Sequence, residues 1–199
     1  MKWMTRLFCI AILGLWCLHA IGASPDSTNW RIRAAAWRSY ISSPSPRNGE
    51  RLYKLLPSVT DHSIALDSSS YWAIYGDLWS LKQLVVKQER AAVKIAFKLF
   101  AICDADFCET LNEILGPLIR INPTMFLEEL SRHRRLVGHL GGLVGSLGDE
   151  FVDQRSRTLR ELELRVNSLK TVQKPALHSM RDECIAELNG ELRLLSETH

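Results

Sequence analysis

The sequence lacks the short motifs that mark common active sites. Its 199 residues contain no Walker phosphate-binding motif, no Gly-x-Gly-x-x-Gly fingerprint and no Gly-x-Ser-x-Gly nucleophile motif. His-Glu-x-x-His and Cys-x-x-Cys, the usual spacings of zinc ligands, are absent as well. We therefore expect a protein that is not an enzyme and that carries no metal or other cofactor.

A strong excess of one charge is also missing. The formal net charge is +3, and removal of residues 1–23 would delete Lys2 and Arg6 and no carboxylate, which leaves +1. Proteins that bind nucleic acid usually carry a basic excess that neutralises phosphates. The near-neutral balance argues against a polyanion, so we expect no nucleic acid among the partners.

An apolar run stands at the N-terminus, but it is too short to span a membrane, which takes about 20 residues. The three parts of a secretory signal peptide follow one another there: the basic Lys2 and Arg6, the apolar run Leu7–Leu18, and the small residues Ala20, Gly22 and Ala23. We predict a signal peptide over residues 1–23, cleaved after Gly22 or Ala23, with an uncleaved anchor as the alternative. The exported chain, residues 24–199, is then one domain without a transmembrane segment.

Cysteine is sparse in the predicted exported chain, which keeps Cys103, Cys108 and Cys184. An oxidising compartment allows these at most one internal bridge and one spare thiol. Cys103 and Cys108 are the natural pair, but on one unbroken helix they would lie too far apart. A disulfide needs a chain reversal at Asp104-Ala105, and the sequence leaves both states open. Cys184 lies on an apolar stripe, which favours a buried side chain over a reactive thiol.

Helical spacing of apolar residues recurs along residues 24–199, whereas strand-like alternation does not. The spacing predicts helices from Ser27 or Thr28 to Ile41, over Glu50–Leu56, over Tyr71–Lys87, from Val93 to Cys103, from Asp106 to Leu118, over Thr124–Arg132, over Leu159–Val172 and from Pro175 onward. Asn122 before Pro123 is typical of a helix N-cap. Residues 42–67 are expected to be rich in loops. We predict an all-α fold, either an irregular helical bundle or a short HEAT-like stack of α-hairpins.

Three segments carry a resemblance to known proteins: Tyr71-Trp-Ala-Ile-Tyr-Gly-Asp-Leu-Trp79, Asn122-Pro-Thr-Met-Phe-Leu-Glu-Glu-Leu130 and Arg181-Asp-Glu-Cys184. Through them the chain resembles uncharacterised exported all-helical proteins of bacteria. The short stacked helices of residues 72–132 also resemble the α-hairpins of HEAT and armadillo-type repeats. The resemblance implies export to a bacterial periplasm, with secretion to the extracellular space as the alternative. It brings no known active site with it.

Glycine is concentrated in one segment, Gly138–Gly148. Gly138 and Gly142 are four residues apart, as are Gly141 and Gly145, and small residues at this spacing let helices approach closely. Close packing or a buried turn is therefore the favoured interpretation. A backbone that binds a ligand is the first alternative, and membrane association is the second.

A basic cluster, Arg132, Arg134 and Arg135, follows the helix predicted after Asn122. Cations at a helix C-terminus interact favourably with the helix dipole and can cap its last carbonyl groups. The alternative is a site for a small anion or a phospholipid headgroup.

The tryptophans Trp30, Trp37, Trp72 and Trp79 also stand at helical spacing. Aromatic side chains in this arrangement favour a place in the hydrophobic core over a carbohydrate-binding platform.

Together these observations favour an exported, non-enzymatic protein-interaction or scaffold protein whose partner is another envelope or secreted protein. The rival is a small-ligand or envelope-lipid binding protein with a pocket near Gly138–Gly148 and the three arginines at its mouth. An enclosed apolar cavity there would favour the rival, whereas a filled core would favour the interaction protein. A hydrolase comes third, because it needs a polar pocket that gathers histidine and carboxylate side chains.

Overall fold

We describe residues 25–58 and 68–197 of a computed structural model of the chain. Every regular element in them is a helix, which confirms the predicted all-α fold. The elements are α2 (Pro25–Ser42), α3 (Pro46–Leu55), α4 (Ser68–Tyr75), α5 (Leu78–Val86), α6 (Arg90–Leu99), α7 (Ala105–Leu115), α8 (Leu118–Ile121), α9 (Pro123–His133), α10 (Leu140–Gly145), η1 (Asp149–Phe151), α11 (Arg155–Lys170), η2 (Pro175–Leu177) and α12 (His178–Glu197). The predicted signal peptide lies outside the described residues. Within them, no helix combines the length and the apolar character needed to cross a membrane.

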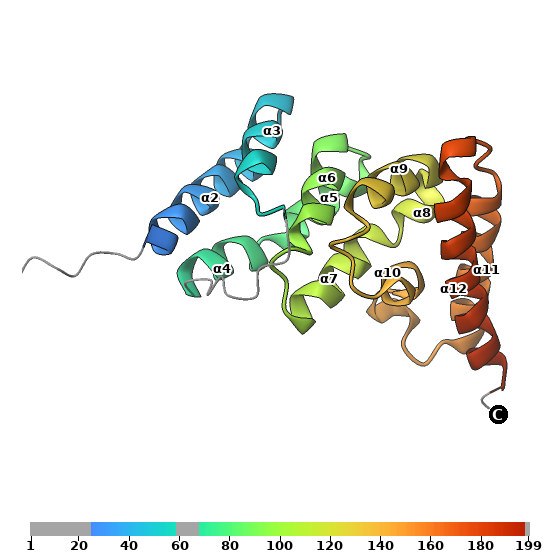
Figure 1. The fold of residues 1–199 in the computed structure, drawn as a ribbon. Coiled ribbons are helices and arrows are strands. Elements are labelled where there is room, and N and C mark those ends of the chain that lie inside the picture. Colours follow the sequence, from blue (N-terminus) through green and yellow to red (C-terminus); the bar gives the residue numbers. More distant parts are fainter. Residues whose placement is uncertain (1–24, 59–67, 198–199) are drawn as a thin grey trace, which may run out of the picture.

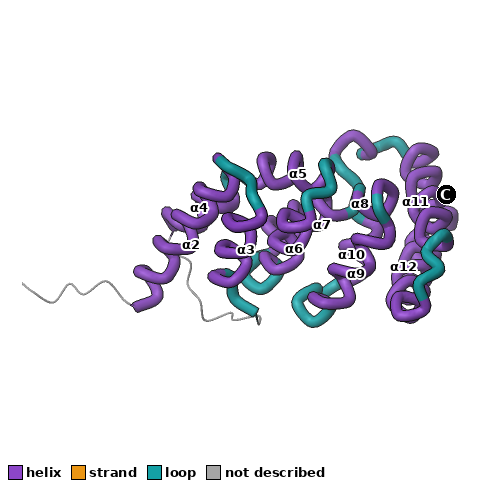
Figure 2. The backbone as a smooth tube through the Cα atoms, turned by 90° about the horizontal axis from the view of Figure 1, so that it is seen from above, coloured by secondary structure: helices purple, strands orange, loops and turns teal. Residues whose placement is uncertain are grey.

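The helices are stacked along one direction, largely in chain order (Figure 1). At one end α2 packs against α3 and α4, and α3 packs against α6. In the middle α6 contacts α5, α7 and α9, and at the other end α10 and α11 pack against α12. The view from above shows the same elongated arrangement, with α2 and α3 at one end and α11 and α12 at the other (Figure 2). A stack of this kind exposes long helix faces, as α-solenoids do.

Helix α3 begins at Pro46, about one turn before the start that the sequence predicted at Glu50. The hydroxyl of Ser45 accepts a hydrogen bond from the N–H of Asn48 at 3.2 Å. Proline suits the first helical position because an N–H there would have no partner within the helix. Residues 59–67 lie outside the described residues.

The helix predicted over Tyr71–Lys87 is in fact two helices, α4 and α5. Gly76 and Asp77 separate them, and glycine is one of the poorest residues in a helix interior. The hydroxyl of Ser80 donates to Asp77 Oδ1 at 2.7 Å in the first turn of α5. This break decides which side chains of α4 and α5 are buried.

The predicted N-cap at Asn122 is confirmed, since its Oδ1 accepts a hydrogen bond from the N–H of Met125 at 3.0 Å and α9 begins at Pro123. The helix predicted from Asp106 to Leu118 ends earlier. Pro117 lies between α7 and the short α8, and proline cannot donate the hydrogen bond that would continue α7.

A contiguous hydrophobic core runs along the stack. Its largest fully buried side chains include Trp30, Trp37, Tyr40, Phe97, Phe107 and Phe126. The free cysteine Cys184 is also buried, as its place on an apolar stripe indicated. Burial raises the pKa of its thiol to about 12, so the thiolate form is scarce at neutral pH.

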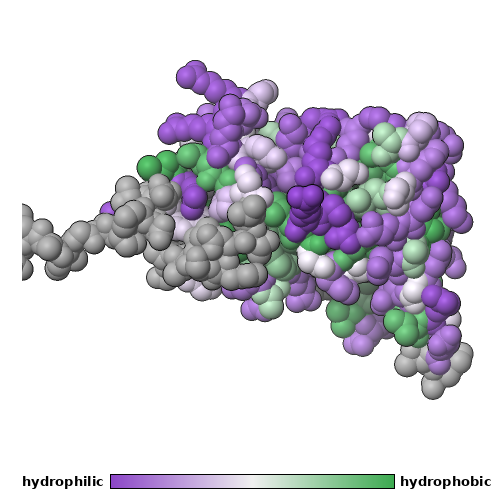
Figure 3. Space-filling view, in the orientation of Figure 1, coloured by the Kyte–Doolittle hydropathy of each residue, from purple (hydrophilic) through white to green (hydrophobic). Residues whose placement is uncertain are grey.

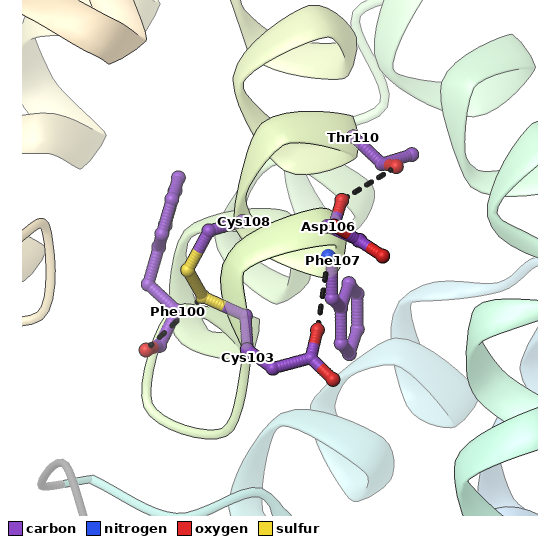
Figure 4. The surroundings of a disulfide bond; sticks show 7 residues. Phe100, Cys103, Asp106, Phe107, Cys108 and Thr110 are labelled. Carbon is purple, nitrogen blue, oxygen red and sulfur yellow. Dashed lines mark hydrogen bonds between the residues drawn. A yellow bond between two sulfur atoms is a disulfide. The ribbon is translucent and has the colours of Figure 1, made fainter.

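Cys103 and Cys108 form a disulfide at the turn between α6 and α7 (Figure 4). Residues 100–104 between the two helices are not helical, so the two cysteines do not lie on one unbroken helix, which would hold them too far apart. Their Cα atoms lie 5.2 Å apart, inside the usual range for disulfides. Asp104 caps the following helix, because its Oδ1 accepts a hydrogen bond from the N–H of Phe107 at 3.1 Å.

A buried arginine fixes the end of α10 against α11. Arg165 is buried, and its Nη1 donates to the carbonyls of Val144 at 2.6 Å and Ser146 at 2.8 Å. Carbonyls in the last turn of a helix have no partner within the helix, so this contact supplies one. Burial, opposed by Glu161, lowers the pKa of Arg165 to about 10, which leaves it charged at neutral pH.

Candidate functional site

The glycine-rich segment forms α10 and packs closely on its neighbours. A Cβ atom at Gly141 would lie 2.8 Å from Glu187 Oε2, and one at Gly142 would lie 2.9 Å from His139 Nδ1. His139 Nδ1 also accepts a hydrogen bond from the N–H of Gly142 at 2.8 Å. The opposite side of α10 fills the core with three buried side chains, Leu140, Leu143 and Val144. The glycines therefore permit close approach of α10 to its neighbours.

An open groove of about 640 Å³ lies between α7, α10 and α12. It is lined by Ala105, Cys108, Glu109, Asn112, His139, Gly141, Gly142, Gly145, Ser146, Glu187, Gly190, Glu191 and Leu194. Three lining residues are carboxylates, and none is lysine or arginine. We call this hollow the acidic groove. It contains the predicted site residues Gly141 and Gly142 but not Gly138, around which there is open space.

The predicted arginine cluster does not line the acidic groove. Arg132 pairs with Glu129 of its own helix, and Arg134 pairs with Glu183 of α12 at 2.7 Å. Arg135 is exposed. Since the arginines lie outside the groove and carboxylates lie inside it, the groove does not suit an anionic phospholipid headgroup, which is one of the ligands that the rival function allows.

A network of polar side chains, of which Lys98, Glu129 and His133 are buried, joins α3, α6 and α9. His133 Nδ1 lies 2.8 Å from the carbonyl of Glu129, and Nε2 lies 2.9 Å from the hydroxyl of Tyr53. Because a carbonyl only accepts, Nδ1 carries the proton of the neutral ring and the Tyr53 hydroxyl donates to Nε2. The ring also stacks on Phe97, with centroids 5.9 Å apart.

Two buried charges complete this polar network. The carboxylate of Glu129 is fully buried, and its Oε1 accepts hydrogen bonds from Arg90 at 3.3 Å and from Arg132. Lys98 is also buried, and it donates to the carbonyl of Tyr53 at 2.7 Å. Its Nζ lies 4.2 Å from the centroid of the Tyr53 ring. These partners offset part of the cost of burying charge.

The electrostatics of the polar network do not suit a tyrosine nucleophile. A pocket of about 240 Å³ borders Tyr53 and Arg90, and the Tyr53–His133 pair has the spacing of a nucleophile and its base. However, burial and the nearby Glu129 raise the pKa of Tyr53, and burial lowers the pKa of His133. A phenol that holds its proton tightly beside a weakened base is a poor nucleophile. We therefore interpret the network as a structural link between three helices.

Two tryptophans are exposed, which the sequence did not indicate. Trp72 of α4 is 61% exposed and Trp79 of α5 is 68% exposed, so their predicted place in the core is wrong. Trp30 and Trp37, predicted in the same way, are buried. The break between α4 and α5 accounts for the difference, because each short helix turns its own apolar face, such as Ile74 in α4, toward the core.

A second open groove, also about 640 Å³, adjoins Trp79 between α5 and α7. Its lining is Tyr75, Gly76, Leu78, Trp79, Lys82, Thr110, Glu113, Ile114, Gly148 and Glu150. The Tyr75 ring meets Trp72 and Phe107 edge-on, at centroid distances of 5.7 and 5.6 Å, which links an exposed indole to the core. Lys82 Nζ lies 5.4 Å from the Trp79 ring. We call Trp72, Trp79 and this groove the tryptophan surface.

No group of three or more histidine, cysteine, aspartate or glutamate side chains among the described residues is arranged to hold a metal ion. The sequence contained one hint of the acidic groove, since Glu187 and Glu191 are one turn apart on the last predicted helix. Nothing in the sequence placed Glu109 beside them.

The sequence matches no family model, and comparisons with curated proteins and with solved structures find no match either. The surfaces of the molecule itself are therefore the guide to its function.

Proposed function

We propose that this chain is an exported, non-enzymatic protein-interaction protein that binds its partner at the tryptophan surface. The observation that carries the proposal is the exposure of Trp72 and Trp79 on a molecule that buries Trp30 and Trp37 completely. Tryptophan is depleted from ordinary protein surfaces and enriched at the centres of interfaces.

The shape of the tryptophan surface supports a macromolecular partner. Its groove is open and is lined by aromatic, aliphatic and charged residues together. A partner side chain could bury apolar area against Trp79 while Lys82 meets polar groups at the rim, which is the usual anatomy of an interface.

Export is supported by the disulfide between Cys103 and Cys108, because such bonds persist mainly in oxidising compartments. A bacterial periplasm is the compartment that we propose, and the partner is then another envelope protein. Secretion to the extracellular space would satisfy the same chemistry.

The rival proposal, a small-ligand or lipid binder near Gly138–Gly148, receives less support. The space beneath α10 is filled by aliphatic side chains, and the groove beside it is open and acidic. Native mass spectrometry tests this rival directly. A small mass that co-purifies with the chain and is lost on denaturation would favour the ligand binder over the interaction protein.

The proposal is tested by placing a photo-crosslinking amino acid at Thr110, which lines the same groove as Trp79, and irradiating cells that produce the chain. The adduct identifies the partner, which is then purified and titrated against the chain by calorimetry. Trp79→Ala is expected to weaken binding at least about thirtyfold, as truncation of an interface hot spot does. Ile121→Ala, which alters an exposed apolar side chain on α8, is the control and should leave affinity unchanged.

Two results would overturn the proposal. One is the absence of any adduct at Thr110 when a crosslinker at an exposed position outside the tryptophan surface does capture protein. The other is a purified partner whose affinity is the same for wild type and Trp79→Ala.

A further inference from the structure

The end of the stack formed by α2 and α3 is strongly basic. Residues 25–58 contain six lysine and arginine residues and two carboxylates. Arg31, Arg38, Arg47 and Arg51 are exposed, and none of them has an ion-pair partner within the described parts of the chain. Hydrophilic side chains project from this end in the space-filling view (Figure 3). We call these four arginines the basic end.

The spacing of the arginines gathers them on helix faces. Arg31 and Arg38 are about two turns apart on α2, and Arg47 and Arg51 are about one turn apart on α3. Residues at these spacings lie on the same side of a helix. Helix α2 and helix α3 therefore each present a pair of the basic-end guanidinium groups on one side.

The acidic groove has the opposite character. Glu109, Glu187 and Glu191 are exposed, and they too have no ion-pair partner among the residues that the structure describes. A guanidinium, with five N–H donors and a permanent positive charge, matches such a set of acceptors.

The two surfaces lie toward opposite ends of the stack, so they do not meet within one molecule (Figures 1 and 2). We propose that the chain associates head to tail, with the basic end of one copy seated against the acidic groove of the next. The interface is heterologous, because two different patches of the same chain meet in it. Copies can therefore add at both ends of an assembly. This inference is independent of the tryptophan surface.

Such an interface is governed by charge and is sensitive to salt. Exposed ion pairs each contribute little, so several of them are needed for measurable association. The Debye length falls from about 30 Å at 0.01 M ionic strength to about 8 Å at 0.15 M. The assembly is therefore expected to be reversible and to weaken at least about tenfold between these two conditions.

Sedimentation velocity of the purified chain over a concentration series tests the inference. At low ionic strength the weight-average mass should rise with concentration beyond that of a dimer, and at physiological ionic strength the rise should shift to higher concentration. A chain that stays monomeric at low ionic strength overturns the inference. So does association that is insensitive to salt, because it would identify an apolar interface.

Charge-reversed variants decide which surfaces meet. Arg47→Glu combined with Arg51→Glu, and Glu187→Arg combined with Glu191→Arg, should each abolish self-association. An equal mixture of the two double variants should restore it, because the reversed charges are again complementary. Failure of the mixture to associate, while both variants keep the circular dichroism of the wild type, overturns the proposed pairing.

A matched control separates local contacts from net charge. Arg135→Glu combined with Arg160→Glu changes the net charge as much as the basic-end variant does, on exposed residues outside both surfaces. It should associate like the wild type, and loss of association in this control would overturn the specific pairing. Trp79→Ala should also associate normally, so failure of this inference and failure of the proposed function are distinguishable.

Discussion

Two tryptophan pairs with the same spacing have opposite environments in this molecule. Trp30 and Trp37 are seven residues apart on α2 and are buried, whereas Trp72 and Trp79 are also seven apart and are exposed. The first pair lies on one unbroken helix, which turns a single face toward α3 and α4. The second pair is divided between α4 and α5. Spacing predicts a shared face only where the helix between the two residues is continuous.

The largest expected effect comes from truncating one indole of each pair. Trp37→Ala should lower the free energy of unfolding by about 3–5 kcal/mol, because it leaves a cavity in the core. Trp79→Ala should change it by less than about 0.5 kcal/mol, as exposed substitutions usually do. Urea denaturation followed by circular dichroism measures both. Equal losses would contradict the contrast between the pairs.

A smaller loss of stability is expected at Gly49, where α3 packs against α6. Helix α3 also packs against α2, which carries the buried tryptophan pair. A Cβ atom at Gly49 would lie 2.6 Å from the Cβ of Ala91 and 3.2 Å from the Tyr40 ring. Gly49→Val should therefore destabilise the protein by about 1–3 kcal/mol through overpacking. Gly138→Val is the matched control, since nothing lies within 4 Å of its added Cβ. Thermal unfolding of both variants checks the difference.

The polar network tests whether buried polar contacts also hold the stack. Tyr53→Phe removes the hydroxyl that donates to His133 Nε2 and should cost about 1 kcal/mol of unfolding free energy. The loss should appear in chemical denaturation at neutral pH. Tyr40→Phe is the matched comparison and should cost less, because the buried Tyr40 hydroxyl has no hydrogen-bond partner in the described structure. Equal stability of wild type and Tyr53→Phe would show that the hydrogen bond contributes nothing.

Acidification should weaken the same network. Burial lowers the pKa of His133, an effect that the Glu129 carbonyl and carboxylate oppose and that Lys98 and Arg132 reinforce. The unfolded chain therefore binds a proton more readily than the folded one just below the ordinary histidine pKa of about 6.5. The contribution of neutral His133 to the free energy of unfolding is therefore complete above that pH, and it is lost as the pH drops toward the folded-state pKa. His133→Gln should flatten this part of the profile measured by denaturation at several pH values.

The smallest expected effect is on tryptophan fluorescence, which can be measured while the protein stays folded. In a chain without residues 1–23, which carry Trp3 and Trp16, iodide or acrylamide should quench the fluorescence of Trp72 and Trp79 and leave that of Trp30 and Trp37 almost unaffected. Trp72→Phe combined with Trp79→Phe should remove most of the quenchable signal while the unfolding midpoint stays the same. A large quenchable fraction in that double variant would place the buried pair at the surface.

Much of the fold followed from local patterns. The three- and four-residue spacing of apolar side chains predicted an all-α fold, and Asn122 with Pro123 marked a helix start that the structure confirms. The early start of α3 at Pro46 was missed, although Ser45 and Pro46 form the same kind of signal. The break at Gly76 was missed because a glycine inside a helix costs only about 1 kcal/mol, which tertiary packing often overrides.

The functional surfaces were harder to predict. The sequence singled out six residues near the glycine-rich segment, and the structure brings only Gly141 and Gly142 into a groove. That groove is acidic because α7 and α12, distant in the chain, supply carboxylates to it. The polar network likewise joins side chains from α3, α6 and α9, so no local pattern contains it.

The sequence by itself determined that this chain forms helices and where several of them begin, because periodicity and capping depend on residues within a few positions of one another. Only the tertiary structure decided which indoles are exposed, which charges are buried and where the grooves lie. These properties depend on how helices from distant parts of the chain cross. A small local break, such as Gly76-Asp77, is enough to redirect a helix face from the core to the solvent.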